Sequence, residues 1–202
     1  MPKREPPAVR EEEILNACEQ LYKTMNFRDV TIKEIGAATS FSRPSIYNYF
    51  QTKEEIFLRL FEREYLLWCG DLETMAADGV KADALPERLA RSLEKRELML
   101  KLLAVNLYDM EENSRIERLV QFKKAYGKSV ELLDSVLKNA FPKKTDQARR
   151  QMLLAALQFL HGVYPYAHAT PKQTAAMDAV GIRHDNGGVY DLSLAGLSMI
   201  LK

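Results

Sequence analysis

Two Thr-x-x-Glu sequences, Thr31–Glu34 and Thr52–Glu55, constrain how the first third of the chain can fold. In such a capping box the threonine side chain accepts a hydrogen bond from a backbone N–H one turn later. The glutamate side chain in turn accepts a hydrogen bond from the backbone N–H of the threonine. Each sequence therefore predicts a helix start. The residues between the two starts fit a short helix carrying Ile32, Ile35 and Ala38, a turn, and a second short helix.

The rest of the chain shows only helical periodicity. Apolar residues recur at spacings of three and four, and Pro142 stops the longest such run. We expect the first helix of the chain to end near Asn26. The later helices are expected to run from about Thr52, from Pro86, from Ile116 to Ala140, from Asp146 to Tyr166, from Thr170-Pro171, and from Val189 to Leu201. No stretch predicts a strand. The sequence therefore predicts an all-α fold, with three short helices first and longer ones after.

Composition narrows the function classes without choosing one. The 202 residues hold 29 Lys and Arg against 28 Asp and Glu, so net charge neither favours nor excludes a nucleic-acid partner. Cys18 and Cys69 give no disulfide framework and no metal-ligand spacing, which fits a reducing cytoplasm. The start of the chain is polar, and the longest apolar stretch, residues 152–160, is far short of a membrane span. We expect a soluble cytoplasmic protein.

The stretch "SFSRPSIYNYFQTKEE", residues 40–55, carries the most informative side chains. A helix drawn through it places Ile46 and Phe50 on one face and Pro44, Ser45, Tyr47 and Asn48 on the other. Solvent-facing helix positions usually hold Glu, Lys, Gln or Ala, so this second face indicates contact with another molecule.

Two short helices joined by a tight turn form a helix-turn-helix when the second one presents such a face to the DNA major groove. Arg43, Ser45 and Asn48 suit base edges, Tyr47 and Tyr49 suit phosphates and thymine methyls, and Lys53 offers a charge to a phosphate. The competing interpretation is a structural helix pair with a solvated polar face, which is common in all-α proteins.

The segment "TIKEIGAATSFSRPSIYNYFQTKEEIF", Thr31 to Phe57, resembles the DNA-binding signature of the TetR family of bacterial transcriptional regulators. With the first helix, the resemblance covers about the first third of the chain, and the remainder matches only in length and helical pattern. Two residues depart from the signature: Gly36 replaces an alanine, and Ser40 replaces a glycine of the turn. If Ser40 had to adopt a positive φ, it would add strain of order 1 kcal/mol.

The resemblance implies a helix-turn-helix DNA-binding domain at residues 1–52 and a larger helical ligand-binding and dimerisation domain at residues 53–202. Members of the family are homodimers that pair their last two long helices, and they release a palindromic DNA operator when a small molecule enters the larger domain. This behaviour is that of a repressor. The DNA-contacting residues implied by the resemblance are Thr31, Lys33, Ser42, Arg43, Pro44, Ser45, Tyr47, Asn48, Tyr49 and Lys53.

Two helices of the second part support a dimer. The helix from Asp146 to Tyr166 is apolar almost all round between Met152 and Leu160, which predicts burial on two sides, either in the core of a monomer or partly against a second subunit. The last helix carries Leu192, Ala195, Gly196 and Met199 on one stripe, and its small residues allow close approach.

Other functions find less support. His161, His168 and His184 lack metal-ligand spacing, and the chain has no phosphate-binding glycine loop and no nucleophile elbow. We therefore predict no catalytic residue, no metal and no cofactor, which makes an enzyme the weakest hypothesis. A helical adaptor that binds another protein through the Tyr47 face is the alternative to DNA binding.

The effector site is the least constrained part of the prediction. Lys123 falls on an apolar stripe with Leu119, Val120, Tyr126, Val130 and Leu137. One interpretation is that Lys123 buries its stem and extends its charge to water. The other is that it faces a mostly apolar pocket with Trp68, Met99, His161 and Tyr164, which would suit an aromatic or amphipathic ligand, including an anion.

Overall fold

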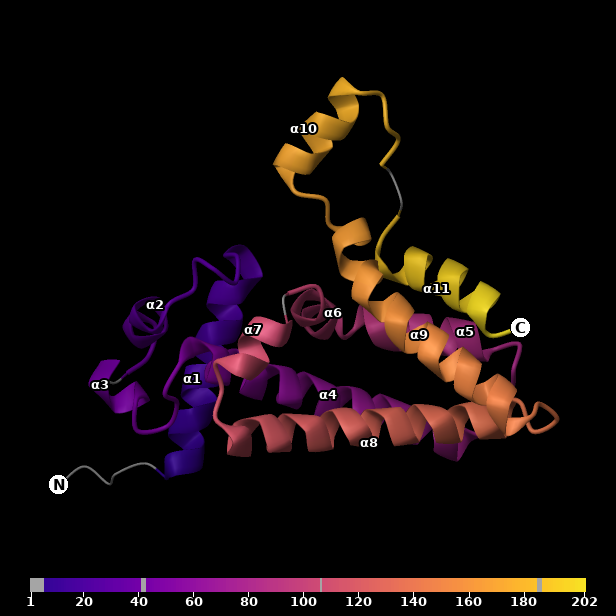
Figure 1. Ribbon diagram of the computed structural model, residues 1–202, viewed down its shortest axis with the longest axis horizontal. Coiled ribbons are helices and arrows are strands. Elements are labelled where there is room, and N and C mark those ends of the chain that lie inside the picture. The colour runs from indigo at the N-terminus through magenta and orange to yellow at the C-terminus, as the bar shows by residue number, and fades with distance from the viewer. Residues whose placement is uncertain (1–5, 41–42, 106, 185–186) are drawn as a thin grey trace. The chain divides into compact units, whose positions relative to one another are not determined.

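The computed structural model describes residues 6–40, 43–105, 107–184 and 187–202, and over these ranges the chain forms helices and turns without a strand (Figure 1). The predicted all-α fold is confirmed. The helices are, in chain order, α1 (Pro7–Thr24), α2 (Ile32–Ala37), α3 (Arg43–Ile46), α4 (Lys53–Asp78), α5 (Leu85–Glu94), α6 (Glu97–Leu103), α7 (Leu107–Glu112), α8 (Ile116–Ala140), α9 (Asp146–Ala167), α10 (Pro171–Ala179) and α11 (Val189–Ile200). None of these described helices is both long and apolar enough to cross a bilayer.

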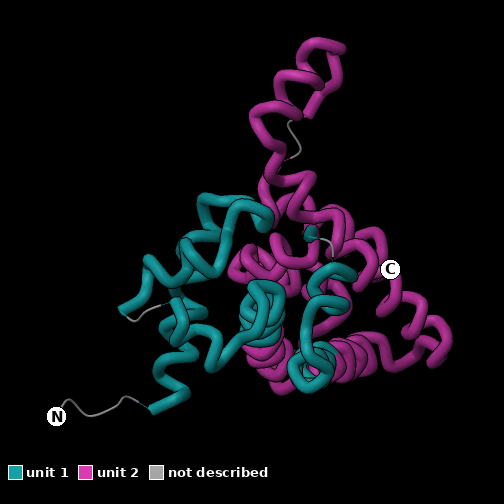
Figure 2. The backbone as a smooth tube through the Cα atoms, turned by 60° about the vertical axis from the view of Figure 1, so that its left-hand side comes forward, with its two compact units in different colours: residues 1–63, 105–126 teal, residues 64–104, 127–202 magenta. Residues whose placement is uncertain are grey.

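The chain divides into two compact units, and each unit is made of two segments (Figure 2). The first unit comprises residues 1–63 and 105–126, and the second comprises residues 64–104 and 127–202. The first unit therefore contains α7 and the beginning of α8 as well as α1, α2, α3 and the beginning of α4. Of the three N-terminal helices predicted to be short, α2 and α3 are short, whereas α1 has 18 residues. The functional boundary after residue 52 remains a prediction.

The core of the first unit joins α1 to the beginning of α4. Ile14 and Tyr22 of α1 are buried, as are Phe57 and Leu60 of α4. The rings of Tyr22 and Phe57 meet edge to face with 5.0 Å between their centroids, a favourable aromatic geometry. Since α2 packs on α1 and α3 packs on α2, this core supports both short helices.

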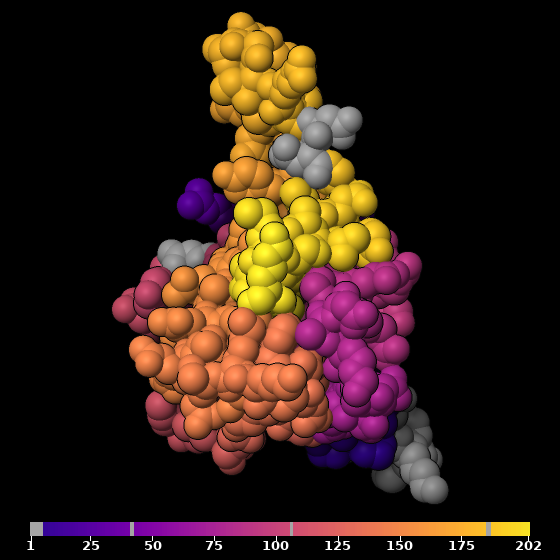
Figure 3. All heavy atoms as spheres, turned by 90° about the vertical axis from the view of Figure 1, so that its right-hand side faces the viewer, coloured from indigo at the N-terminus to yellow at the C-terminus, as the bar shows by residue number. Residues whose placement is uncertain are grey.

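The second unit is built around α11, which packs against α5 and α9, while α6 packs against α9. Figure 3 shows α11, in yellow, between orange α9 and magenta α5. α5 has its buried residues on one face, including Leu85, Leu89 and Leu93. The predicted helix start at Thr170 is a complete capping box with Gln173, although α10 buries none of its residues.

Gly196 is a point of close approach between α11 and α9. A Cβ atom added at Gly196 would lie 2.3 Å from Cζ and 2.4 Å from Cε2 of Phe159, much closer than van der Waals contact. The absence of a side chain at Gly196 therefore makes room for the Phe159 ring. The small-residue stripe predicted on the last helix has a packing role at this position.

Replacing Gly196 with alanine should reduce the free energy of unfolding by a net ~1 kcal/mol, because overpacking typically costs more than alanine gains over glycine inside a helix. Denaturant titration measures the change. Gly70→Ala in α4 is the matched control: its Cβ would have no atom within 4 Å. We expect that variant to be more stable by roughly 0.5–1 kcal/mol. Equal stabilisation in both variants would show that Phe159 moves aside without cost.

Candidate DNA-binding surface

The short helices α2 and α3 form the helix-turn-helix arrangement predicted from the sequence. The Thr31 side chain accepts a hydrogen bond from the N–H of Glu34 at 3.4 Å, which caps α2. α3 is a single helical turn, and the N–H groups of Tyr49 and Phe50 extend it by donating to the carbonyl of Ile46 at 2.8 Å and 3.0 Å. We call residues 43–50 the recognition segment.

The recognition segment has one buried and one exposed side. Ile46 and Phe50 are completely buried, which confirms that they attach the segment to the core. On the other side, the side chain of Tyr47 is 46% exposed. Of the other predicted contact residues, five are exposed: Thr31, Lys33, Arg43, Pro44 and Asn48. Three are half-buried: Ser45, Tyr49 and Lys53. Ser42 lies outside the described residues.

The two departures from the family signature have different structural settings. No described residue other than glycine has a positive φ, so Ser40 carries none of the strain that a left-handed conformation would add. Its N–H and its hydroxyl both donate to the carboxylate of Glu13 in α1. A Cβ at Gly36 would meet Arg43 and Ile46 at 3.5 Å, an ordinary contact, so alanine would also fit there.

Lys53 is occupied by contacts within the first unit. Its ammonium group donates to the carbonyls of Phe27 at 2.8 Å and Arg28 at 3.4 Å, and it lies 4.4 Å from the centroid of the Phe27 ring. Lys53 therefore holds the turn that precedes α2. A phosphate would have to share or replace these contacts, so the predicted DNA contact of Lys53 is less direct than that of an unengaged lysine.

Glu55 contributes an interaction that the sequence analysis did not predict. The N–H of Glu55 donates to the Thr52 hydroxyl at 3.2 Å, as in a capping box, but its carboxylate accepts from the N–H of Gln51 at 2.8 Å. The same carboxylate accepts from Nε and Nη2 of Arg115 at 2.6 Å and 2.8 Å and from the N–H of Arg115 at 3.0 Å. Glu55 thus binds the residue that precedes α8.

The partners of Glu55 control its charge. Burial by itself raises the pKa of this carboxyl, but the hydrogen bonds from the Arg115 side chain and from the N–H groups of Gln51 and Arg115 outweigh burial and lower the pKa to about 2. Glu55 is therefore ionised at neutral pH, although its side chain is only 1% exposed.

Arg115 and Arg118 support the recognition segment, and the sequence analysis did not predict this role. Both donate to the carbonyl oxygen of Tyr49, at 3.3 Å and 3.1 Å. A signal for them exists in the sequence, because two arginines at the start of a helix oppose its macrodipole and need acidic or carbonyl partners. The identity of those partners, some sixty residues away, has no local pattern.

Four of the five residues predicted for the effector pocket lie in the second unit. Trp68 and Met99 are buried in the second unit, where the Trp68 indole donates to the Ser92 hydroxyl at 3.3 Å. Also in that unit, Nδ1 of His161 lies 3.3 Å from the carbonyl oxygen of Leu103, and the ring of the half-buried Tyr164 packs beside His168. The assignment of these residues to one pocket remains a prediction.

Lys123 belongs to the first unit and makes a 2.6 Å ion pair with Glu111. The apolar stripe predicted around it is confirmed at Leu137, which is buried, and is wrong at Val120, which is exposed. Phe122 and Ala125, which were not assigned to the stripe, are buried. The Phe122 ring packs on Phe61 with 5.2 Å between centroids. Because neighbouring helix positions differ by about 100°, the burial of Phe122 turns Lys123 toward solvent.

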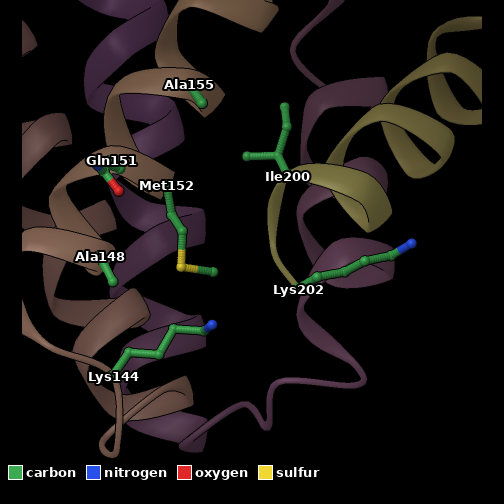
Figure 4. A pocket seen from close by; sticks show the side chains of 7 residues that line it. All are labelled: Lys144, Ala148, Gln151, Met152, Ala155, Ile200 and Lys202. Atoms are coloured by element: carbon green, nitrogen blue, oxygen red, sulfur yellow. The ribbon is translucent and has the colours of Figure 1, made fainter.

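A separate hollow lies in the second unit between α9 and α11 (Figure 4). Its volume is about 330 Å³, and its lining residues are Lys144, Ala148, Gln151, Met152, Ala155, Ile200 and Lys202. None of the residues predicted for the effector pocket lines it. The hollow is amphipathic, with the stems of two lysines beside Met152 and Ile200.

The helix-turn-helix with its exposed aromatic and polar side, together with a larger helical unit, defines the class of helix-turn-helix regulators. The family of "Bacterial regulatory proteins, tetR family" matches residues 14–60, and the "Tetracyclin repressor-like, C-terminal domain" family matches residues 62–186. The chain therefore belongs to the TetR family of bacterial transcriptional regulators, as its resemblance predicted.

Individual relatives match the chain in different ways. The uncharacterized HTH-type transcriptional regulator YfiR of Bacillus subtilis is 38% identical over 53 residues, which are 26% of this chain and 26% of that protein. The match thus spans about a quarter of the length of that curated relative. Two solved structures match nearly the whole fold at low identity. The fatty acid degradation regulator FadR from Bacillus halodurans has a TM-score of 0.61 and 14% identity and covers 94% of this chain and 97% of its own. The Thermus thermophilus FadR, solved with lauroyl-CoA, has a TM-score of 0.57 and 19% identity and covers 95% and 93%.

Glu55→Gln should make the protein less stable at about pH 7 and should also flatten the acid side of its stability profile. The folded pKa of about 2 lies below the ordinary value of 4.5, so the stabilisation is complete above pH 4.5 and is lost as the pH falls toward 2. Denaturant titrations of both proteins at a series of pH values measure the two curves. Parallel curves for wild type and Glu55→Gln would contradict this role of the carboxylate.

Proposed function

We propose that the protein is a cytoplasmic transcriptional repressor that binds a palindromic DNA operator as a homodimer and leaves it when a small molecule binds. The observation that carries this proposal is the exposed side of the recognition segment, where Tyr47 and Asn48 lie opposite the buried Ile46 and Phe50. An aromatic and polar face on a firmly packed segment suits base edges and phosphates. Cys18 and Cys69 are buried and form no disulfide among the described residues, in keeping with a reducing compartment.

The recognition segment supplies the side chains that read sequence in this proposal. Arg43 and Asn48 offer hydrogen bonds to base edges, and Tyr47 offers its ring to a thymine methyl and its hydroxyl to a phosphate. Nη2 of Arg43 lies 3.3 Å from the Tyr47 hydroxyl, so the two side chains are presented together. Contacts to the DNA backbone come from the start of α2, at Thr31 and Lys33. Pro44, Ser45, Tyr49, Lys53 and Ser42 complete the proposed interface.

The proposed dimer interface is formed by α9 and α11. Leu154 of α9 is 45% exposed and Met199 of α11 is 73% exposed, and Ala195 is exposed on the same helix as Met199. Exposed apolar side chains on two adjacent helices favour burial against a second copy in a helical bundle. Two copies would present two recognition segments, which fits a palindromic site.

The proposed effector is an amphipathic molecule bound in the second unit. Trp68, Met99 and Tyr164 supply apolar and aromatic side chains there, with His161 as a polar group. The T. thermophilus FadR was solved with lauroyl-CoA, an amphipathic anion, and this makes acyl-CoA thioesters a reasonable first class of probe. Effector binding and DNA binding would oppose each other by the same factor in both directions.

Selection from random duplexes should enrich a palindrome with half-sites about one helical turn, roughly 10 base pairs, apart. Its affinity for the full-length protein should fall steeply with salt, because phosphate contacts release counterions. A duplex with one half-site scrambled is the matched control and should bind much more weakly, since one half-site anchors only one subunit. Lauroyl-CoA, but not coenzyme A alone, should release the palindrome.

Three results would count against parts of this proposal. A protein that enriches no duplex and shows no salt-dependent affinity would favour the adaptor that uses the Tyr47 face. A monomer in light scattering would remove the dimer. Release of DNA by neither thioester nor coenzyme A would exclude this probe class while leaving the DNA-binding function in place.

A further inference from the structure

The carbonyl of Tyr49 ends the recognition segment and accepts hydrogen bonds from two guanidinium groups. Nη2 of Arg115 lies 3.3 Å from this oxygen and Nη2 of Arg118 lies 3.1 Å from it. Carbonyls at the end of a helical turn lack partners within the turn, and positive charge is favourable beside them. The donors come from residues 66 and 69 positions later in the chain.

Arg115 is fixed in this position by Glu55. The buried carboxylate of Glu55 accepts from Nε and Nη2 of the Arg115 guanidinium and from the backbone N–H of Arg115, so neither the side chain nor its backbone can shift independently. A second link joins the same regions, because the Thr52 hydroxyl donates to the carbonyl of Asn113 at 2.9 Å. The turn between α7 and α8 is thus tied to the residues that follow the recognition segment.

Arg118 ties the segment to a third element. Its guanidinium lies 4.9 Å from the centroid of the buried Phe50 ring, and Nη1 lies 3.4 Å from the Glu11 carboxylate of α1. One side chain therefore contacts the carbonyl of Tyr49, the ring of Phe50 and a carboxylate of α1. Only 24% of the Arg118 side chain is exposed, and its described contacts point into the first unit.

We propose that Arg115 and Arg118 are positioning residues for DNA binding, which hold the end of the recognition segment from outside the helix-turn-helix. The proposal rests on the proposed DNA-binding function. The family match for the DNA-binding part ends at residue 60, yet residues 105–126 belong to the same compact unit as residues 1–63. In this chain the helix-turn-helix is completed by the segment that carries Arg115 and Arg118.

Positioning affects affinity because base-edge hydrogen bonds need correct geometry at several side chains together. If the carbonyl of Tyr49 is released, the turn formed by Tyr49 and Phe50 loses its outer support, and the exposed side chains sample more orientations before DNA binds. The apparent affinity for DNA falls in proportion to the fraction of molecules that hold the binding-competent geometry. The arginines act through Tyr49 and need no contact with DNA.

The test compares Arg118→Ala with Arg59→Ala in the full-length protein. Arg59 is a matched control because its Nε also binds the Glu11 carboxylate, at 3.0 Å, while its other described ion pair is with Glu62 in its own helix. Both variants lose one positive charge from the same cluster. Their long-range effects on DNA affinity should therefore be similar, and only Arg118→Ala removes a donor from Tyr49.

Two measurements are made on each variant. Hydrogen exchange without DNA should show the amides of Tyr49 and Phe50 exchanging about tenfold faster in Arg118→Ala, the factor expected for losing one charge-assisted hydrogen bond. Exchange in α9 should stay unchanged. Affinity for the selected palindrome should fall roughly tenfold in Arg118→Ala relative to Arg59→Ala, with the same salt dependence in both.

Unchanged exchange at Tyr49 and Phe50, or equal loss of affinity in both variants, would overturn the proposal. So would a salt slope lower by about one unit in Arg118→Ala alone, since that is the mark of a lost phosphate contact. Arg118→Lys keeps a donor and should restore part of the protection, and it replaces the alanine variant if that variant fails to fold. Wild type that binds no duplex would refute the proposed function, whereas the exchange result tests the positioning contact by itself.

Discussion

The ionised carboxylate of Glu55 is buried, and the geometry of the first unit depends on how its charge is compensated. Removing a carboxylate from water costs several kcal/mol unless charged and N–H donors replace the lost hydration. Arg115 and the N–H of Gln51 supply those donors. Since the same guanidinium also reaches the carbonyl of Tyr49, compensating the charge also fixes the end of the recognition segment.

Local sequence signals predicted most of the helices, although not α6 and α7, and they predicted the orientation of the recognition segment. Ile46 and Phe50 are one helical turn apart, and this spacing alone placed both in the core, where they are found. Thr31 and Thr170 cap helices as predicted, because capping depends on residues only three positions apart. The family signature then indicated which exposed residues to consider for DNA contact.

Interactions between residues far apart in the chain could not be predicted from local sequence signals. The Thr52–Glu55 pattern predicted a capping box, but the Glu55 carboxylate accepts hydrogen bonds from Arg115 instead. No periodic pattern in the sequence indicates that these two residues meet. On α8, the predicted apolar stripe shares Leu137 with the buried face but includes the exposed Val120, whereas Phe122 is buried against Phe61. Lys53 was predicted to contact a DNA phosphate, yet its ammonium group donates hydrogen bonds to the carbonyls of Phe27 and Arg28.

We propose that the recognition segment binds DNA with its exposed side and is held to the core by its buried side. Comparing Tyr47→Ala with Ile46→Ala tests it most directly, by measuring affinity for the selected palindrome and free energy of unfolding in both. Tyr47→Ala should lose affinity and keep its stability, whereas Ile46→Ala should lose roughly 2 to 4 kcal/mol of stability as well as affinity. A destabilised Tyr47→Ala beside an unaffected Ile46→Ala would contradict this orientation of the segment.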